Sequence, residues 1–116
     1  FYESFVSHMG GEHFVVSLKL EDHERFTANL CELFDQQVQQ IYTPEEVKKG
    51  YIKAIDRHKQ EVRCKLMALS VGVAHTQFRY FKSAKKVFEV LAQVRQMAHP
   101  KDGSSTVFVD RRRSDR

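Results

Sequence analysis

Apolar and polar positions in the first third of the chain predict a β-hairpin followed by an amphipathic helix. Two apolar runs, residues 5–8 and residues 14–20, flank the paired glycines Gly10 and Gly11, which is typical of two strands joined by a tight turn. Between residues 26 and 41, apolar side chains recur at helical spacing and polar side chains fill the opposite face. This segment is therefore expected to pack its apolar stripe against a core.

The middle of the chain predicts a short capped helix and a second pair of strands. Residues 43–46 read Thr-Pro-Glu-Glu, a capping box with proline at the first helical position, and Gly50 is expected to end the helix. The pattern then predicts a strand at 51–56, a turn at 58–60 and a longer returning strand at 62–74. Residues 66–74 are almost entirely apolar, which favours a central strand covered on both faces.

The last third of the chain predicts one more helix and one more strand. Ser83 has the residue type of an N-cap, and an apolar stripe follows it from Ala84 to Ala98. Pro100 and Gly103 are expected to end this helix, and residues 106–109 are expected to form a final strand. The order of elements predicts an α+β domain in which helices pack on an antiparallel-rich sheet.

Composition limits the classes of protein to which the chain can belong. With 116 residues, 41% of them hydrophobic, a single domain with a modest core is expected. No run approaches the roughly 18 apolar residues of a membrane span, so no membrane partner is expected. The first residues show no basic segment followed by an apolar one, so no signal peptide is expected. A cytoplasmic location is therefore expected. Cys31 and Cys64 are interpreted as buried thiols in a reducing cytosol rather than as a disulfide.

The charge of the chain is only mildly basic. Its formal net charge is +4, and part of that excess lies in residues 110–116, which are expected to form a solvated basic tail after a domain spanning residues 1–109. An unrelated α+β nucleic-acid binder is one function class for such a chain. Nucleic acid is not expected as a partner, because binding to its phosphates depends on many Lys and Arg side chains and the excess of positive charge is small.

The sequence Gly10-Gly11-Glu12-His13-Phe14 at a hairpin, followed by an amphipathic helix and a strand that reads Ser70-Val71-Gly72-Val73, resembles the GGDEF domain. That family comprises the diguanylate cyclases, which condense two GTP molecules into cyclic di-GMP, and many degenerate relatives. The resemblance covers residues 5–109, with the hairpin through residues 50–57 as an insertion. It implies a nucleotide-cyclase or ferredoxin-like sheet that here lacks its first strand and helix.

The resemblance also implies roles for particular residues. The paired glycines Gly10 and Gly11 would let backbone amides approach nucleotide phosphates, although taken alone they also fit an ordinary turn that needs positive φ. Glu12 would help to hold Mg²⁺ together with GTP. Near the last helix, His99 stands where the family has a phosphate-binding lysine, and Lys101 would partly compensate. Phe14 is expected to anchor the hairpin in the core.

Other positions depart from the active members of the family. His13 replaces a glutamate that binds metal and activates the attacking hydroxyl, and its imidazole is a poor ligand for magnesium. The inhibitory Arg-x-x-Asp is absent, since the corresponding stretch reads Phe1-Tyr2-Glu3-Ser4. Two-metal phosphoryl transfer needs several converging carboxylates, and this chain offers one. No catalytic residue is therefore expected, and His13 marks a degenerate position.

These observations favour a catalytically inactive GGDEF-like regulatory or interaction module of bacterial cyclic di-GMP signalling, with weak GTP binding and with sensor or output domains as partners. The alternative is a diguanylate cyclase whose activity needs the missing N-terminal segment. Without a first strand, residues 14–20 and residues 66–74 would present unpaired sheet edges. Open edges recruit other chains, so self-association or a rearranged sheet is also expected.

Overall fold

The computed structural model describes residues 4–77, 79–99 and 104–113, and these form a mixed α+β arrangement. Its elements, in chain order, are β1 (Phe5–His8), β2 (Phe14–Ser17), α1 (His23–Val38), α2 (Pro44–Lys49), β3 (Tyr51–Ile55), β4 (Glu61–Lys65), β5 (Ser70–Val73), α3 (Ala84–Met97) and β6 (Thr106–Val109). Short 3-10 turns at Leu20–Asp22 and Gln39–Ile41 flank α1. The predicted α+β class is confirmed.

The described strands pair as three separate two-stranded sheets. β1–β2 and β3–β4 are antiparallel hairpins, whereas β5 and β6 run parallel. The prediction of one antiparallel-rich sheet is therefore not met by the described residues. In particular, β2 and β5 do not pair with each other, and each has a strand partner on one side only.

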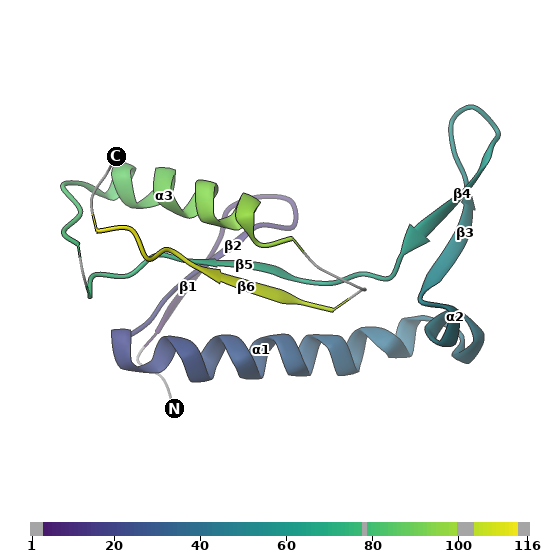
Figure 1. The fold of residues 1–116 in the computed structure, drawn as a ribbon, viewed down its shortest axis with the longest axis horizontal. Helices are drawn as coiled ribbons and strands as arrows, with labels where there is room; N and C mark the ends of the chain where they lie inside the picture. Colours follow the sequence, from purple (N-terminus) through teal and green to yellow (C-terminus); the bar gives the residue numbers. More distant parts are fainter. Residues whose placement is uncertain (1–3, 78, 100–103, 114–116) are drawn as a thin grey trace.

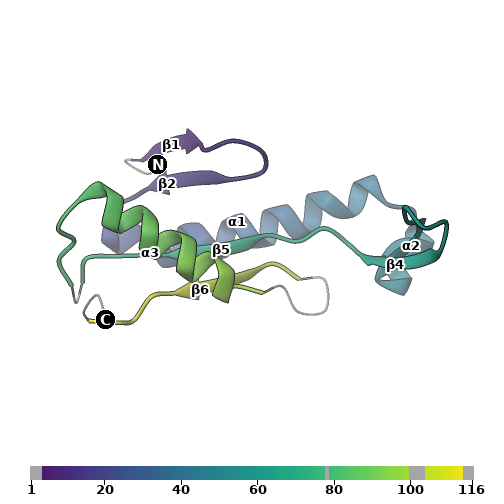
Figure 2. The ribbon, with the colours of Figure 1, turned by 90° about the horizontal axis from the view of Figure 1, so that it is seen from above.

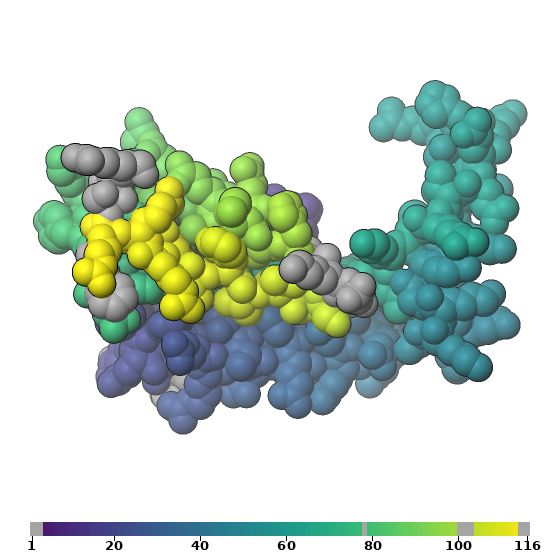
Figure 3. Space-filling view, in the orientation of Figure 1, coloured from purple at the N-terminus to yellow at the C-terminus, as the bar shows by residue number. Residues whose placement is uncertain are grey.

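The β5–β6 pair forms the middle layer of the molecule (Figure 1). Helix α3 lies on one of its faces and α1 runs along the other, while the β1–β2 hairpin lies beside these layers (Figure 2). The most buried apolar side chains come from α3 and its end: Val90, Val94 and Ala98. Helix α2 and the β3–β4 hairpin stand apart at the far end of α1 (Figure 3). The core thus lies between α3 and β5–β6.

The local end signals of two helices are confirmed. Thr43 Oγ1 accepts a hydrogen bond from Glu46 N at 3.1 Å, and Glu46 Oε1 accepts one from Thr43 N at 2.8 Å, which completes the capping box of α2. Gly50 ends this helix in the left-handed conformation, with φ at 81°. At α3, Ser83 Oγ accepts a hydrogen bond from Lys86 N. These short-range patterns fix where α2 and α3 begin.

The predicted strand at 62–74 is wrong, because the structure divides it into β4 and β5 in different sheets. Between them, Met67 N donates a hydrogen bond to Tyr42 Oη at 3.0 Å, and Leu69 N donates one to Ser105 Oγ at 2.8 Å. These amides bond to side chains rather than to a neighbouring strand. Side-chain acceptors from distant segments thus interrupt an apolar run that reads locally as a strand.

Three expectations about single elements also need correction. The strand expected at 14–20 ends at Ser17, before the turn at Leu20–Asp22. Phe14 is 64% exposed rather than buried, and its ring stacks on His8 at 4.6 Å between centroids. Both cysteines are free thiols as expected, yet Cys64 is exposed and Cys31 only half-buried. For Phe14, the alternation of apolar and polar residues does not show which face of the two-stranded hairpin packs on the core.

Gly72 is the position where α3 approaches the sheet most closely. A Cβ built there would lie 2.5 Å from the backbone N of Arg95 and 2.8 Å from Val94 Cγ2. Only a residue without a side chain allows this separation between helix and strand. The glycine of the Ser-Val-Gly-Val strand therefore has a packing role in this fold.

Candidate functional site

The turn that carries the paired glycines is closed by two backbone hydrogen bonds. Met9 N donates to His13 O at 2.8 Å, and His13 N donates to Gly10 O at 3.1 Å. Gly10 and Gly11 both have positive φ, 96° and 57°, which side-chain-bearing residues rarely adopt. A Cβ on either glycine would meet nothing within 4 Å. Within this structure, backbone conformation rather than close approach accounts for the glycines.

The rest of the turn lies open to solvent. His8 Nε2 donates to Gly11 O at 2.7 Å, which braces the turn from the adjacent strand. The side chain of Glu12 is 88% exposed, and its carboxylate lies 3.9 Å from His13 Nε2. Glu12 is therefore an exposed acid on the surface of the turn, close to the imidazole of the next residue.

His13 is joined to helix α3 by a contact that the sequence did not predict. Its Nδ1 lies 2.5 Å from an amino nitrogen (NH1) of Arg95. A guanidinium has no acceptor, so His13 Nδ1 accepts this hydrogen bond and the ring proton lies on Nε2, the nitrogen that faces Glu12. The lone pair that a general base needs is therefore already occupied. The two residues are 82 positions apart, and no local pattern in the sequence marks Arg95 as a partner.

The side chains at the turn do not fit a pair of magnesium ions. They supply one carboxylate from Glu12, an imidazole from His13 and a positive charge from Arg95, whereas Mg²⁺ prefers several oxygen ligands. Across residues 4–77, 79–99 and 104–113, no group of three or more His, Cys, Asp or Glu side chains is placed to hold a metal. Lys101, the remaining predicted phosphate contact, lies outside the described residues.

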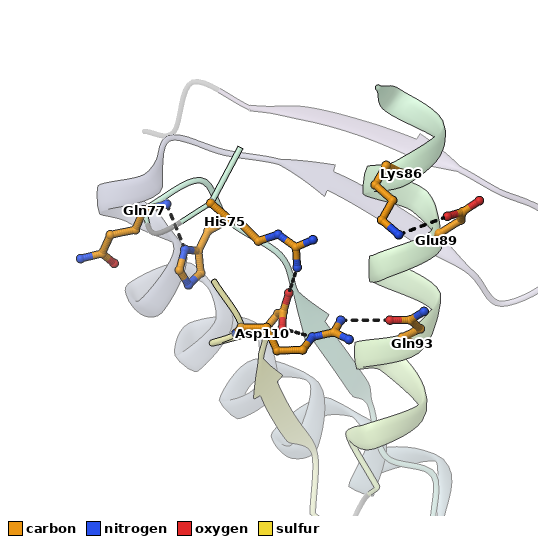
Figure 4. Close-up of polar contacts among 8 residues, drawn as sticks. His75, Gln77, Lys86, Glu89, Gln93 and Asp110 are labelled. Carbon is orange, nitrogen blue, oxygen red and sulfur yellow. Dashed lines mark hydrogen bonds and ion pairs between the residues drawn. The ribbon is translucent and has the colours of Figure 1, made fainter. Parts of the chain in front are cut away.

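A second polar cluster ties the end of the chain to the domain (Figure 4). Asp110 Oδ2 accepts a hydrogen bond from an amino nitrogen (NH1) of Arg79 at 2.9 Å, and its Oδ1 accepts one from Arg112 Nε at 2.8 Å. Arg112 also donates to Gln93 Oε1 of α3 at 3.0 Å. The first residues of the expected basic tail are thus bound to the folded domain.

The charge state of Asp110 follows from these contacts. Burial by itself would raise the pKa of Asp110, but the hydrogen bonds and charge of Arg112, together with the charge of Arg79, outweigh it and lower the pKa. The carboxylate is consequently ionised in the folded protein. The side chains of Asp110 and Arg79 are only 2% and 3% exposed, so this pair lies inside the fold and stabilises it, whereas the side chain of Arg112 is 43% exposed.

Comparison of the chain with protein-family models, with curated proteins and with solved structures gives no match. The likeness to the GGDEF domain therefore rests on the residues of the sequence and enters the functional conclusion as a proposal. In the described parts of the chain, no helix combines the length and the apolar character that crossing a membrane requires.

Proposed function

We propose that this chain is a catalytically inactive GGDEF-like module that serves regulation or protein interaction in bacterial cyclic di-GMP signalling. The observation that carries the proposal is the composition of the glycine turn. Gly10 and Gly11 adopt left-handed conformations at a hairpin, as a nucleotide loop would need, but only one carboxylate, that of Glu12, accompanies them. The residue after it is His13, whose Nδ1 accepts a hydrogen bond from Arg95.

The proposal includes weak binding of GTP at this turn, in which the protein contacts the phosphates directly and does not require Mg²⁺. The amides of Gly11 and Glu12 take part in no hydrogen bond described for the turn, and Arg95 brings a positive charge to the neighbouring His13. Backbone amides and a guanidinium recognise phosphate without a metal. A single exposed carboxylate gives a metal ion little to bind. A cytoplasmic location and a sensor or output domain in the same protein belong to the same proposal.

Nucleotide binding by matched glycine variants tests this proposal. Titration of the chain with GTP, followed by NMR, is expected to give a Kd on the order of 0.1–1 mM that changes by less than about twofold when Mg²⁺ is replaced by EDTA. Gly11→Ala is expected to weaken binding, because alanine resists the φ of 57° that the turn requires.

Gly50→Ala is the matched control, since Gly50 has a φ of 81° at the end of α2, away from the turn. It is expected to leave the affinity for GTP unchanged. Equal effects of the two substitutions, or binding that depends strongly on Mg²⁺, would contradict the proposal. The second of these outcomes would favour the alternative function, a diguanylate cyclase.

A further inference from the structure

A groove of about 240 Å³ separates β2 from β5. Val16 and Leu18 line one of its walls, and Gly72 and Ala74 line the other. Apolar side chains of both helices also line the groove, Phe26 and Leu30 from α1 and Leu91 from α3. Helices α1 and α3 lie on opposite faces of the β5–β6 layer (Figure 1), and side chains of both line the groove.

The backbone of β5 directs unused hydrogen-bonding groups into this groove. Asp110 N donates to Val73 O at 2.8 Å, and Thr106 N donates to Leu69 O at 2.9 Å, so the odd-numbered residues face β6. Successive residues of a strand direct their N–H and C=O groups to opposite edges. The groups of Gly72 and Ala74 therefore point away from β6 and toward the groove.

The backbone of β2 does the same from the other side. Met9 N donates a hydrogen bond to His13 O, so Met9 and His13 form a hydrogen-bonded pair of the hairpin. Such pairs recur at every second position of an antiparallel ladder, and the next one is Ser7 with Val15. Val16 lies between such pairs, and its N–H and C=O point away from β1. Two strand edges thus face one another across an apolar groove, where unpaired backbone groups carry a free-energy cost.

We propose that a strand from a second copy of this chain fills the groove and joins the two sheets into one. This inference does not depend on nucleotide binding or on the proposed signalling role. A strand placed there would pair on both edges, and the helices would cover both of its faces. Strand addition of this kind obtains its affinity from the main-chain hydrogen bonds.

The occupant that fits is β1 of the second copy. A strand between two helices needs apolar side chains on both faces, and consecutive strand residues point to opposite faces. In β1, Phe5 is 68% exposed and Val6 is 60% exposed, so both faces carry apolar surface that the single copy leaves in water. A strand in the groove uses both of its edges, so β1 of the second copy would leave its own β2, and the turn at Gly10 and Gly11 is the segment that would open.

Sedimentation velocity over a concentration series, with two proline variants, tests the inference. The unmodified chain is expected to dimerise as its concentration rises. Val16→Pro removes an N–H that faces the groove and leaves the hydrogen bonds to β1 in place, so it is expected to weaken the dimer at least about tenfold. Arg63→Pro is the matched control, because Arg63 occupies the equivalent non-hydrogen-bonded position of β4 in the remote hairpin. It is expected to leave the dimer unchanged.

Hydrogen exchange of the unmodified chain gives a second readout that needs no variant. The amides of Gly72 and Ala74 are expected to become protected as the dimer forms, while those of the β3–β4 hairpin do not change. A monomer at every concentration would overturn the inference. A dimer that Val16→Pro leaves intact, or that leaves Gly72 and Ala74 unprotected, would overturn it as well.

Discussion

An amino nitrogen (NH1) of Arg79 lies 2.9 Å from Asp110 Oδ2, and both side chains are almost completely buried. This ion pair joins the loop that follows β5 to the residue that follows β6. Asp110 is further held by Arg112, which reaches α3 through Gln93. The parallel pair of strands is thus closed at one end by a charged cluster rather than by apolar side chains.

Asp110→Asn is expected to lower the free energy of unfolding by about 3 kcal/mol at pH 7, since it removes the negative charge from a buried ion pair with Arg79. Urea denaturation followed by circular dichroism measures this. Glu45→Gln, an exchange of the same kind at an exposed position of α2, serves as the control and is expected to have almost no effect.

The same variant makes a prediction about pH. The pKa of Asp110 is lower in the folded chain than its ordinary value of about 3.9, so the ionised carboxylate stabilises the fold above that value. As the pH falls from about 4 through the lower folded pKa, the contribution is lost. The stability difference between the unmodified chain and Asp110→Asn is therefore constant near neutrality and shrinks below pH of about 4. A difference that grows on acidification would contradict the ionised pair.

Gly72→Ala is expected to destabilise the fold by about 1–3 kcal/mol, because the added Cβ would contact the backbone of α3 at Arg95. Thermal unfolding of the variant measures the loss. Ser70→Ala, at an exposed position of the same strand, is the control and is expected to unfold at nearly the same temperature as the unmodified chain. Equal midpoints for all three proteins would show that α3 does not pack on Gly72 as described.

The two cysteines are expected to react at different rates with a thiol reagent at pH 8. Burial and the nearby charge of Asp35 raise the pKa of Cys31, which lowers its thiolate fraction, whereas Cys64 is exposed. Labelling with Ellman's reagent should therefore show one fast and one slow thiol. In Cys64→Ser only the slow phase should remain, and a remaining fast phase would contradict the placement of Cys31 in α1.

Sequence patterns located most of the elements because their determinants are short-range. The helix at Pro44–Lys49 begins with a capping box and ends at Gly50, all within eight residues. By contrast, the division between β4 and β5 depends on Tyr42 and Ser105, which are distant in sequence from the amides that they bind. An apolar run alone gives no indication of such partners.

The candidate site was predictable only in its local part. The residue pattern indicated the hairpin turn and its lone acid, Glu12, and the structure brings Gly10, Gly11 and His13 together there. It did not indicate Arg95, which reaches His13 across 82 positions. Nor did it indicate the ion pair of Asp110, because charged residues near a chain end usually lie in solvent.

The central claim is that the glycine turn lacks the carboxylates needed to join two nucleotides. The most direct test is chromatography of the products after the chain is incubated with GTP and Mg²⁺, with His13→Glu measured beside it. The account predicts no cyclic di-GMP from either protein, because a second acid beside Glu12 still leaves too few ligands for two metal ions. Formation of cyclic di-GMP by the unmodified chain would contradict it.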